Sequence, residues 1–366
     1  MKFAPSLITL TALVASSPGS LPAQSAERVS PEWTDAIDLL IEGQAWSGDD
    51  LAHPYHRLPA RAQGAVREAV WDLGRQSAGL SVRFVTDSPQ VSVEWTVTHE
   101  FRMDHMTNMG ISGVDLYARD GDRWRWVGSG RVRDPLTNRA TLVSNAPPGE
   151  HDYRLYLPLY TGTESVRIGV VPGHAVVAPP VQDRRPIVFY GTSITQGGCA
   201  SRPGMAYPSI LGRHLGWPVV NLGFSGNGRM DPEVGELLAG IDAALFVLDC
   251  GANMTAEWAR ERTVPFIRAL RAARPDTPIL VIEDAQSQSL WFSAAGRESN
   301  DEKNAIVREA LATLRAEGVE NLHHREFTGL IGDDGEGTVD GIHFTDLGFL
   351  RMAESLAPVI EEILSE

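Results

Sequence analysis

The 366-residue chain contains only two cysteines, Cys199 and Cys250. So small a number excludes the disulfide framework that holds many small secreted domains together. The 43% hydrophobic and 22% charged content predicts instead a globular protein with a full core. In an oxidising compartment the two cysteines could form one disulfide, because both follow expected strands. The alternative is two buried free thiols.

Positive charge is also scarce. The 47 acidic residues outnumber the 32 Lys and Arg residues, which gives a formal net charge of -15. Such a field repels the phosphates of nucleic acids and the surfaces of anionic membranes, so neither is an expected partner. A neutral or cationic small molecule or polysaccharide fits better as substrate. A need for solubility alone explains the charge equally well.

No apolar run is long enough to span a bilayer. Residues 3–15 are apolar but interrupted by Pro5, and they follow the positive charge of Lys2. Small residues come next, and residues 23–26 offer cleavage sites. Residues 1–26 are therefore predicted to be a signal peptide, with no cysteine to accept a lipid anchor. We expect a soluble protein, exported to the periplasm or secreted.

Residues 27–180 read as a β-sandwich or jelly-roll module. Short alternating segments are separated by turn residues, and no long helix is evident. Residues 80–85 and 91–97 are predicted to pair as a hairpin through the turn at 87–89. The other expected strands are 114–118, 124–127, 153–157 and 166–170.

Residues 181–366 follow a proline-rich linker, and the spacing of their apolar residues differs from that of the β module. Apolar runs at 187–190, 218–222, 243–248 and 279–282 alternate with helical patterns at 207–215, 232–238, 256–273, 302–317 and 346–364. This alternation predicts a parallel sheet covered by helices on both faces. Ligands of such sheets bind beyond the carboxyl ends of the strands.

A serine stands at the first of these strand ends, in Gly191-Thr192-Ser193. A hydroxyl becomes a useful nucleophile only when a base takes its proton. By itself the motif could equally be a helix N-cap. Near the C-terminus, Asp340 and His343 are spaced so that the carboxylate can orient the imidazole toward a serine. Alone, that pair could be a capping aspartate with an incidental histidine.

Two further strand ends carry hydrogen-bond donors. Gly226 lies in a glycine-rich loop after the second strand, and Asn253 follows the third. The N–H groups of Ser193 and Gly226, with the Asn253 amide, are predicted to form an oxyanion hole. Four such features at successive strand ends favour a catalytic triad of Ser193, Asp340 and His343.

These four segments resemble the SGNH (GDSL-type) hydrolases. The family's catalytic serine, oxyanion glycine and asparagine, and final Asp-x-x-His fall in order on the residues named above. The resemblance implies a flavodoxin-like, three-layer α/β/α domain over residues 181–366 and a serine esterase that needs no cofactor or metal. One position departs from the family, because Thr192 replaces the aspartate of Gly-Asp-Ser.

The upstream module adds a second resemblance. Residues 113–117 (Gly-Val-Asp-Leu-Tyr) look like the Gly-x-Asp-Leu-Tyr signature of a β-rich module that precedes one SGNH branch, and residues 197–205 resemble that branch's continuation of the first block. Members of the branch resemble carbohydrate acetylesterases, which implies small acyl esters on sugars as substrates. A lipase, arylesterase or thioesterase on the same machinery is the alternative, and a catalytically dead carbohydrate-binding protein is a second one.

The remaining candidates have plainer explanations. Trp291 follows the fourth expected strand and could stack on a sugar ring or pack between domains. The methionines at 103, 106 and 109 could roof the site from the β module or simply pack in its core. The histidines at 99, 105, 323 and 324 fit no metal-ligand spacing, so structural roles are expected for them.

Overall fold

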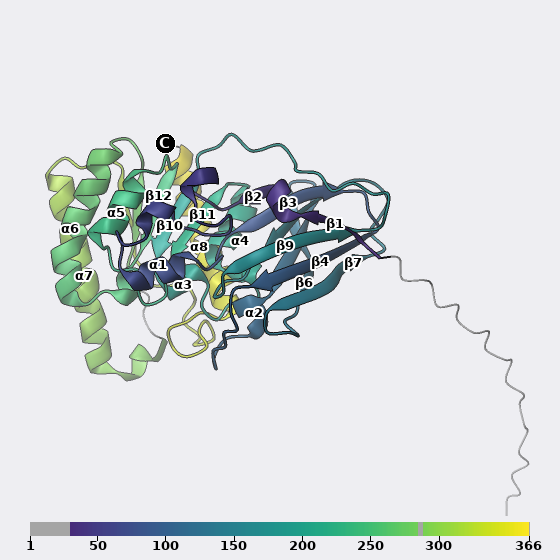
Figure 1. Ribbon diagram of the computed structural model, residues 1–366. Coiled ribbons are helices and arrows are strands. Elements are labelled where there is room, and N and C mark those ends of the chain that lie inside the picture. Colours follow the sequence, from purple (N-terminus) through teal and green to yellow (C-terminus); the bar gives the residue numbers. More distant parts are fainter. Residues whose placement is uncertain (1–29, 285–287, 366) are drawn as a thin grey trace, which may run out of the picture.

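The computed structural model describes residues 30–284 and 288–365 (Figure 1). The expected signal peptide lies outside this part of the chain. Two antiparallel sheets lie together at one end of the molecule, and a parallel sheet flanked by long helices lies at the other. Across the described ranges, no helix combines the length and apolarity that crossing a membrane requires.

The two antiparallel sheets form the expected β-sandwich. Their facing sides bury one apolar cluster that includes Val82, Phe84, Trp95, Leu116 and Ile168. One sheet has the order β1-β9-β4-β7 and the other β2-β3-β8-β5-β6. The strands are β1 (Glu32–Asp35), β2 (Leu40–Glu42), β3 (Ser81–Thr86), β4 (Gln90–Val97), β5 (Val114–Asp120), β6 (Arg123–Gly130), β7 (Thr137–Ser144), β8 (His151–Tyr156) and β9 (Thr163–Val170).

The predicted hairpin of β3 and β4 is wrong, because these strands belong to different sheets. β3 pairs with β2 and β8, whereas β4 pairs with β7 and β9. Ser88 stabilises the turn between them, because its hydroxyl donates to the Gln90 carbonyl and accepts from the Val171 N–H. A hairpin and a corner between packed sheets both send alternate residues into one core, so alternation alone could not separate them.

The parallel sheet has the order β11-β10-β12-β13-β14, the arrangement of a flavodoxin-like fold. In such sheets the chain switches direction beside the first strand, here β10, and ligands bind at that point. The strands are β10 (Ile187–Gly191), β11 (Val219–Gly223), β12 (Leu245–Asp249), β13 (Ile279–Ile282) and β14 (Leu322–Arg325).

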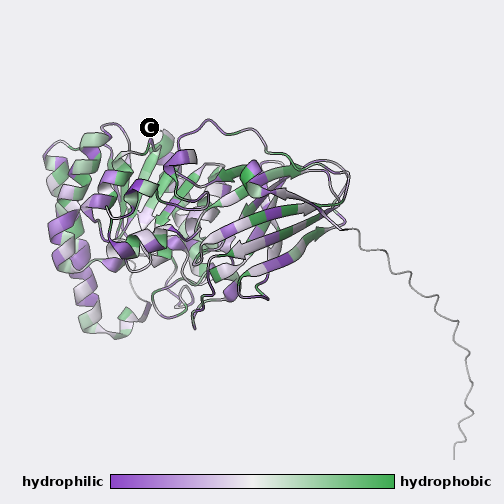
Figure 2. Cartoon of the chain, viewed as in Figure 1, coloured by the Kyte–Doolittle hydropathy of each residue, from purple (hydrophilic) through white to green (hydrophobic). Residues whose placement is uncertain are grey.

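Helices cover both faces of this sheet, as expected. Alternate strand residues supply each face: Val188 and Phe246 lie in one cluster, Phe189 and Val247 in the other. Figure 2 shows apolar strands between helices of mixed polarity. One face packs on α1 (Glu68–Gly74), α5 (Pro232–Ala239), α6 (Ala256–Ala273) and α7 (Ala294–Ala316), the other on α3 (Ser193–Gln196), α4 (Tyr207–Leu215) and α8 (Asp346–Ser365).

Helix α7 begins eight residues before the predicted start at 302. Residues 294–301 carry no apolar repeat, so periodicity could not reveal this part. The start is instead set by a cap, because the Ser293 hydroxyl accepts from the Gly296 N–H at 3.2 Å.

Part of the N-terminal region packs on the α/β layers rather than in the sandwich. Trp46, Leu58 and Trp71 belong to the cluster beneath α5 and α6. Arg57 is buried, and its guanidinium donates to the carbonyls of Asn221 (3.0 Å) and Gly223 (2.8 Å) at the end of β11. This contact fixes the N-terminal segment to the strand end that carries one of the candidate site loops.

The Gly-x-Asp-Leu-Tyr segment latches the sandwich to the α/β domain. Asp115 on β5 is fully buried and accepts hydrogen bonds from the Arg202 guanidinium (2.6 Å) and the Gly204 N–H (3.0 Å). The Tyr117 hydroxyl accepts a second bond from Arg202. The resembling motif therefore works here as an interface, holding the loop that follows the candidate nucleophile.

We predict that Arg202→Ala lowers the free energy of unfolding by about 3–5 kcal/mol, because it leaves the Asp115 carboxylate buried without a charged partner. Arg125→Ala is the matched control. It removes an arginine of β6 from an exposed pair with Asp120 of β5, away from the interface with the α/β domain, and the loss should stay below about 1 kcal/mol. Urea unfolding of both variants tests this. Equal losses of unfolding free energy would contradict a stabilising role for the Arg202–Asp115 pair.

Candidate active site

The Ser193 hydroxyl, in the turn after β10, does not cap the helix that begins there. Thr192 is the N-cap of α3, and its side-chain oxygen accepts from the Ile194 N–H at 3.2 Å. Ser193 follows as the first helical residue. At Gly191 a Cβ would overlap the Thr195 side chain and the Asp249 carbonyl, so only glycine allows the strand to turn so tightly there. The helix-cap explanation thus applies to Thr192 rather than to Ser193.

The three residues expected to form a triad lie in one hydrogen-bonded chain. Ser193 Oγ is 2.9 Å from Nε2 of His343, and Nδ1 of His343 is 2.7 Å from Oδ2 of Asp340. Ser193 is 7% exposed, which limits the water around its hydroxyl. This is the order of contacts by which a carboxylate orients an imidazole and the imidazole accepts a serine proton.

The Asp340 carboxylate is held in its charged form. Its other oxygen accepts from the N–H groups of Ile342 (3.0 Å) and His343 (2.8 Å). Burial raises the pKa of Asp340, but the His343 ring and these N–H groups outweigh it and lower the pKa to about 2. Asp340 therefore stays an anion at any pH at which a neutral imidazole exists.

The expected oxyanion donors are present beside the serine's strand. Asn253, after β12, accepts from the Gly228 N–H at 3.2 Å through Oδ1, so its Nδ2 is left as the free donor. Gly226 adopts a φ of 69° in the loop after β11. Within the described ranges, the N–H groups of Ser193 and Gly226 and Nδ2 of Asn253 have no hydrogen-bond acceptor in the protein. All three can donate to a bound oxyanion.

The sequence did not point to Asp249, a buried carboxyl group that supports the turn of Ser193. Asp249 ends β12 and is 2% exposed. Its Oδ2 accepts from the hydroxyls of Thr195 (2.8 Å) and Tyr207 (2.9 Å), and Thr195 Oγ1 in turn accepts from the Thr192 N–H. This chain of contacts supports the turn that carries Ser193. No motif pointed to it, because an acidic residue at a strand end is common.

The sandwich contributes to the site through the segment before α2 (Asn108–Ser112). His105 lies with its ring centroid 5.4 Å from that of His343. Met106 is buried in the cluster that also holds Cys199 and Ile194 of α3. The methionine segment therefore packs against the α/β domain next to the site. The sequence raised this possibility beside plain packing within the sandwich.

Both cysteines are free and buried, so the possible disulfide is not formed. Cys199 adopts a φ of 71°, in the left-handed region that few residues other than glycine occupy. Burial raises the pKa of the Cys199 thiol to about 12. At neutral pH the thiol is therefore protonated and a poor nucleophile.

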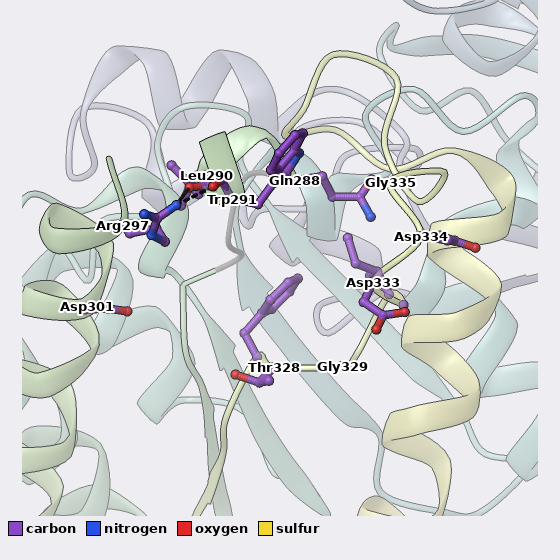
Figure 3. Close-up of a pocket in the computed structure, with 13 residues that line it drawn as sticks. Gln288, Leu290, Trp291, Arg297, Asp301, Thr328, Gly329, Asp333, Asp334 and Gly335 are labelled. Carbon is purple, nitrogen blue, oxygen red and sulfur yellow. Dashed lines mark hydrogen bonds between the residues drawn. The ribbon is translucent and has the colours of Figure 1, made fainter. Parts of the chain in front are cut away.

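Trp291 lies outside this cluster, on the rim of a separate cavity of about 580 Å³ (Figure 3). Its side chain is 78% exposed and lies beside Phe292. Gln288 lines the same cavity and donates its N–H to the Gly341 carbonyl at 2.9 Å, next to Asp340. The cavity therefore adjoins the loop of Asp340 and His343, while Ser193 is not among the residues that line it.

Two of the other histidines have local hydrogen-bond partners. His324 contacts the buried Glu283 at 3.1 Å, and His99 contacts the Thr98 hydroxyl. His323 lines a different cavity with Arg315 and Glu362. His105 contacts Asp104 and also lies against His343, the candidate base. The sequence could not predict this contact, because His105 and His343 lie far apart along the chain.

We predict that Asp249→Asn makes stability less dependent on pH. Burial raises the pKa of Asp249 to about 7, above the value of about 3.9 in an unfolded chain. As pH rises from about 4 to about 7, the unfolded state releases this proton first, so the wild type loses stability. The asparagine has no proton to lose and can still accept both hydroxyl bonds.

Urea unfolding at pH 4, 5.5 and 7 measures this effect. The stability of Asp249→Asn relative to the wild type should rise across the series. Asp49→Asn, at an exposed aspartate, is the control and should show no comparable rise. A difference between Asp249→Asn and wild type that does not change with pH would contradict the prediction.

Two family models match most of the described chain. Residues 31–176 match the N-terminus of SGNH-hydrolase-type esterases, and residues 184–361 match the GDSL-like lipase/acylhydrolase family. A GDSL-like lipase from Bacteroides ovatus is 37% identical, with a TM-score of 0.87 over 91% of this chain and 98% of that one. No curated protein matches the sequence.

Two more distant structures share the fold alone. A salicylyl-acyltransferase from a tetracycline biosynthetic pathway is 17% identical, with a TM-score of 0.72 over 91% of this chain and 97% of that one. A family two carbohydrate esterase from Clostridium thermocellum, solved with cellohexaose, is 18% identical, with a TM-score of 0.57 over 79% and 93%. From its residues, its fold and the 37% identical structure, the chain belongs to the GDSL-like lipase/acylhydrolase family of SGNH hydrolases.

Proposed function

We propose that the protein is an exported serine esterase that removes small acyl groups, acetyl foremost, from carbohydrates. The observation that carries the proposal is the contact of Ser193 Oγ with His343 Nε2 at 2.9 Å, backed by Asp340. In this proposal Ser193 is the nucleophile, His343 the general base and Asp340 the residue that orients the base.

Acylation follows from these contacts. Ser193 Oγ attacks the ester carbonyl carbon while its proton passes to His343 Nε2. The carbonyl oxygen becomes an oxyanion, which accepts from the Ser193 and Gly226 N–H groups and the Asn253 amide. Asp340, kept ionised by its own hydrogen bonds, stabilises the imidazolium. When the intermediate collapses, the C–O bond of the alcohol breaks and His343 returns the proton to that oxygen.

Deacylation repeats the sequence with water. His343 takes a proton from water as the water oxygen attacks the acyl carbon, and the same three donors hold the second oxyanion. Collapse breaks the bond to Ser193 Oγ, which recovers its proton from His343. The products are the free acid and the alcohol, and every group returns to its starting state.

The protein is closely packed beside Ser193. At Gly198 an added Cβ would come within 2.8 Å of the Tyr160 hydroxyl and 3.1 Å of the His343 ring, so the position admits only glycine without a shift of its neighbours. The net charge of -15 suits a neutral sugar better than an anionic lipid. The carbohydrate esterases among the structural neighbours are consistent with this substrate class.

We assign Trp291 to binding of the sugar portion. Its exposed indole lies at the rim of a cavity that also contains Arg297 and Asp301, a mixture of aromatic and polar groups suited to a sugar ring (Figure 3). Gln288 connects this cavity to the loop of Asp340 and His343.

Export and the division into domains belong to the same proposal. We take residues 1–26 as a signal peptide, 27–180 as the β-sandwich module and 181–366 as the hydrolase domain. The N-terminal charge, the short apolar run and the small residues after it support export. An extracellular polysaccharide substrate would agree with that location.

We predict that Ser193→Ala abolishes hydrolysis of p-nitrophenyl acetate, and that Asn253→Ala lowers kcat by roughly a hundredfold or more by removing one oxyanion donor. Ser144→Ala, at an exposed serine on β7, is the control and should keep full activity. Full activity of Ser193→Ala would refute the nucleophile.

The substrate class is tested with acyl esters of increasing length and with acetylated polysaccharides. We expect kcat/KM to fall from acetyl to butyryl to octanoyl p-nitrophenyl esters, and acetate to be released from at least one polysaccharide. A preference for octanoyl esters would favour a lipase on the same machinery. Glycan binding without turnover by the wild type would favour a carbohydrate-binding protein instead.

A further inference from the structure

Three side chains with metal-binding atoms meet beside the proposed nucleophile. One ligand atom each from His105, Cys199 and His343 lies within 4.8 Å of the other two. His105 comes from the sandwich, Cys199 from the loop after α3 and His343 from the loop before α8. Each has a separate structural origin, so no local repeat or shared turn brings the three together.

We propose that His105, Cys199 and His343 bind a thiophilic divalent cation, with Zn²⁺ the best fit, and that its binding switches off the esterase. The loss of activity rests on the proposed role of His343, whereas the binding itself does not. Two imidazoles and one thiolate are a ligand set that Zn²⁺ accepts in tetrahedral sites, with a fourth position open to water.

Carboxylates already orient the two imidazoles as metal ligands. Nδ1 of His105 lies 3.0 Å from Asp104, and Nδ1 of His343 lies 2.7 Å from Asp340. Nε2 is therefore the nitrogen of each ring that can bind a cation, and in His343 the cation would replace the contact with Ser193 Oγ. A carboxylate behind an imidazole is the usual second partner of a metal-bound histidine.

The three ligands need only small movements to close around an ion. With Zn–N of about 2.0–2.1 Å and Zn–S of about 2.3 Å, a tetrahedral site has ligand atoms about 3.3–3.6 Å apart. The His105 side chain is 32% exposed and lies in a loop, which gives the ion a route and the ring room to turn. Cys199 adopts a left-handed backbone conformation, with a φ of 71°. Binding would release the thiol proton to solvent.

Occupancy would block catalysis in one defined way. The lone pair of His343 Nε2 that accepts the Ser193 proton is the one that would bind the cation. With it engaged, the serine has no base. Removing the ion with a chelator restores the lone pair, so inhibition should be fully reversible and distinct from unfolding.

Binding is measured first, by calorimetric titration of ZnCl₂ into chelator-treated Ser193→Ala protein. This variant is inactive under the proposed function but keeps all three ligands. We expect one Zn²⁺ per chain, and affinity weaker by more than about tenfold after His105→Ala or Cys199→Ser is added. His99→Ala, which removes an exposed histidine nearby, is the control and should leave affinity unchanged.

Inhibition is measured next, with p-nitrophenyl acetate and the otherwise wild-type enzyme. Zn²⁺ should inhibit it and EDTA should restore it, whereas the activity that His105→Ala and Cys199→Ser retain should resist Zn²⁺. Co²⁺ should give the absorption band of a cobalt–thiolate bond, lost in Cys199→Ser. If Zn²⁺ does not bind, or if neither substitution weakens binding, the site is refuted whatever the enzyme's activity. Binding without inhibition would refute only the switch.

Discussion

The sharp turn at the carboxyl end of β10 is the constraint on which the rest of the site depends. Gly191 packs backbone to backbone with both neighbouring strand ends: its carbonyl accepts from the Phe224 N–H at 2.9 Å, and its Cα approaches the Asp249 carbonyl too closely for any side chain. Because β10 lies at the switch point of the sheet, the loops after β11 and β12 must end beside the same turn. Gly226 and Asn253 are therefore brought to Ser193 by strand order. Only Asp340 and His343 arrive from elsewhere, on a loop fixed by its own internal hydrogen bonds.

The β-sandwich is joined to this turn rather than appended to the enzyme. Asp115 binds Arg202 and Gly204, which lie shortly after α3, and Arg57 binds the carbonyls at the end of β11. Both contacts bury charged groups, which proteins tolerate only when these groups are well paired. The sandwich thereby fixes two of the loops that form the site, and it brings His105 against His343. A change in the module can alter the chemistry without touching the triad.

The parts of this structure that the sequence predicted are those determined by local pattern. The parallel strands and their helices follow from buried apolar runs, and the candidate site residues follow from their places at strand ends. The β3–β4 hairpin failed because a corner between sheets has the same alternation as a hairpin. The packing of Trp46 and Trp71 on the α/β layers, and the meeting of His105 with Cys199, depend on contacts between distant segments. No local sequence pattern near those residues predicts such contacts. Asp249 could not be recognised for the same reason, since its partners Thr195 and Tyr207 lie on helices elsewhere in the chain.

Thr192 shows why the departure from Gly-Asp-Ser leaves the proposed chemistry intact. The residue before the serine is fully buried, and its side chain serves as the N-cap of α3. An aspartate could make the same cap, but its charge would be buried close to Asp249, which Thr195 links to the Thr192 backbone. Burial already raises the pKa of Asp249 to about 7, so a second carboxylate nearby would add repulsion to desolvation. Threonine supplies the cap without the charge. The exchange changes how the turn is stabilised, and neither the hydroxyl of Ser193 nor its contact with His343 depends on it.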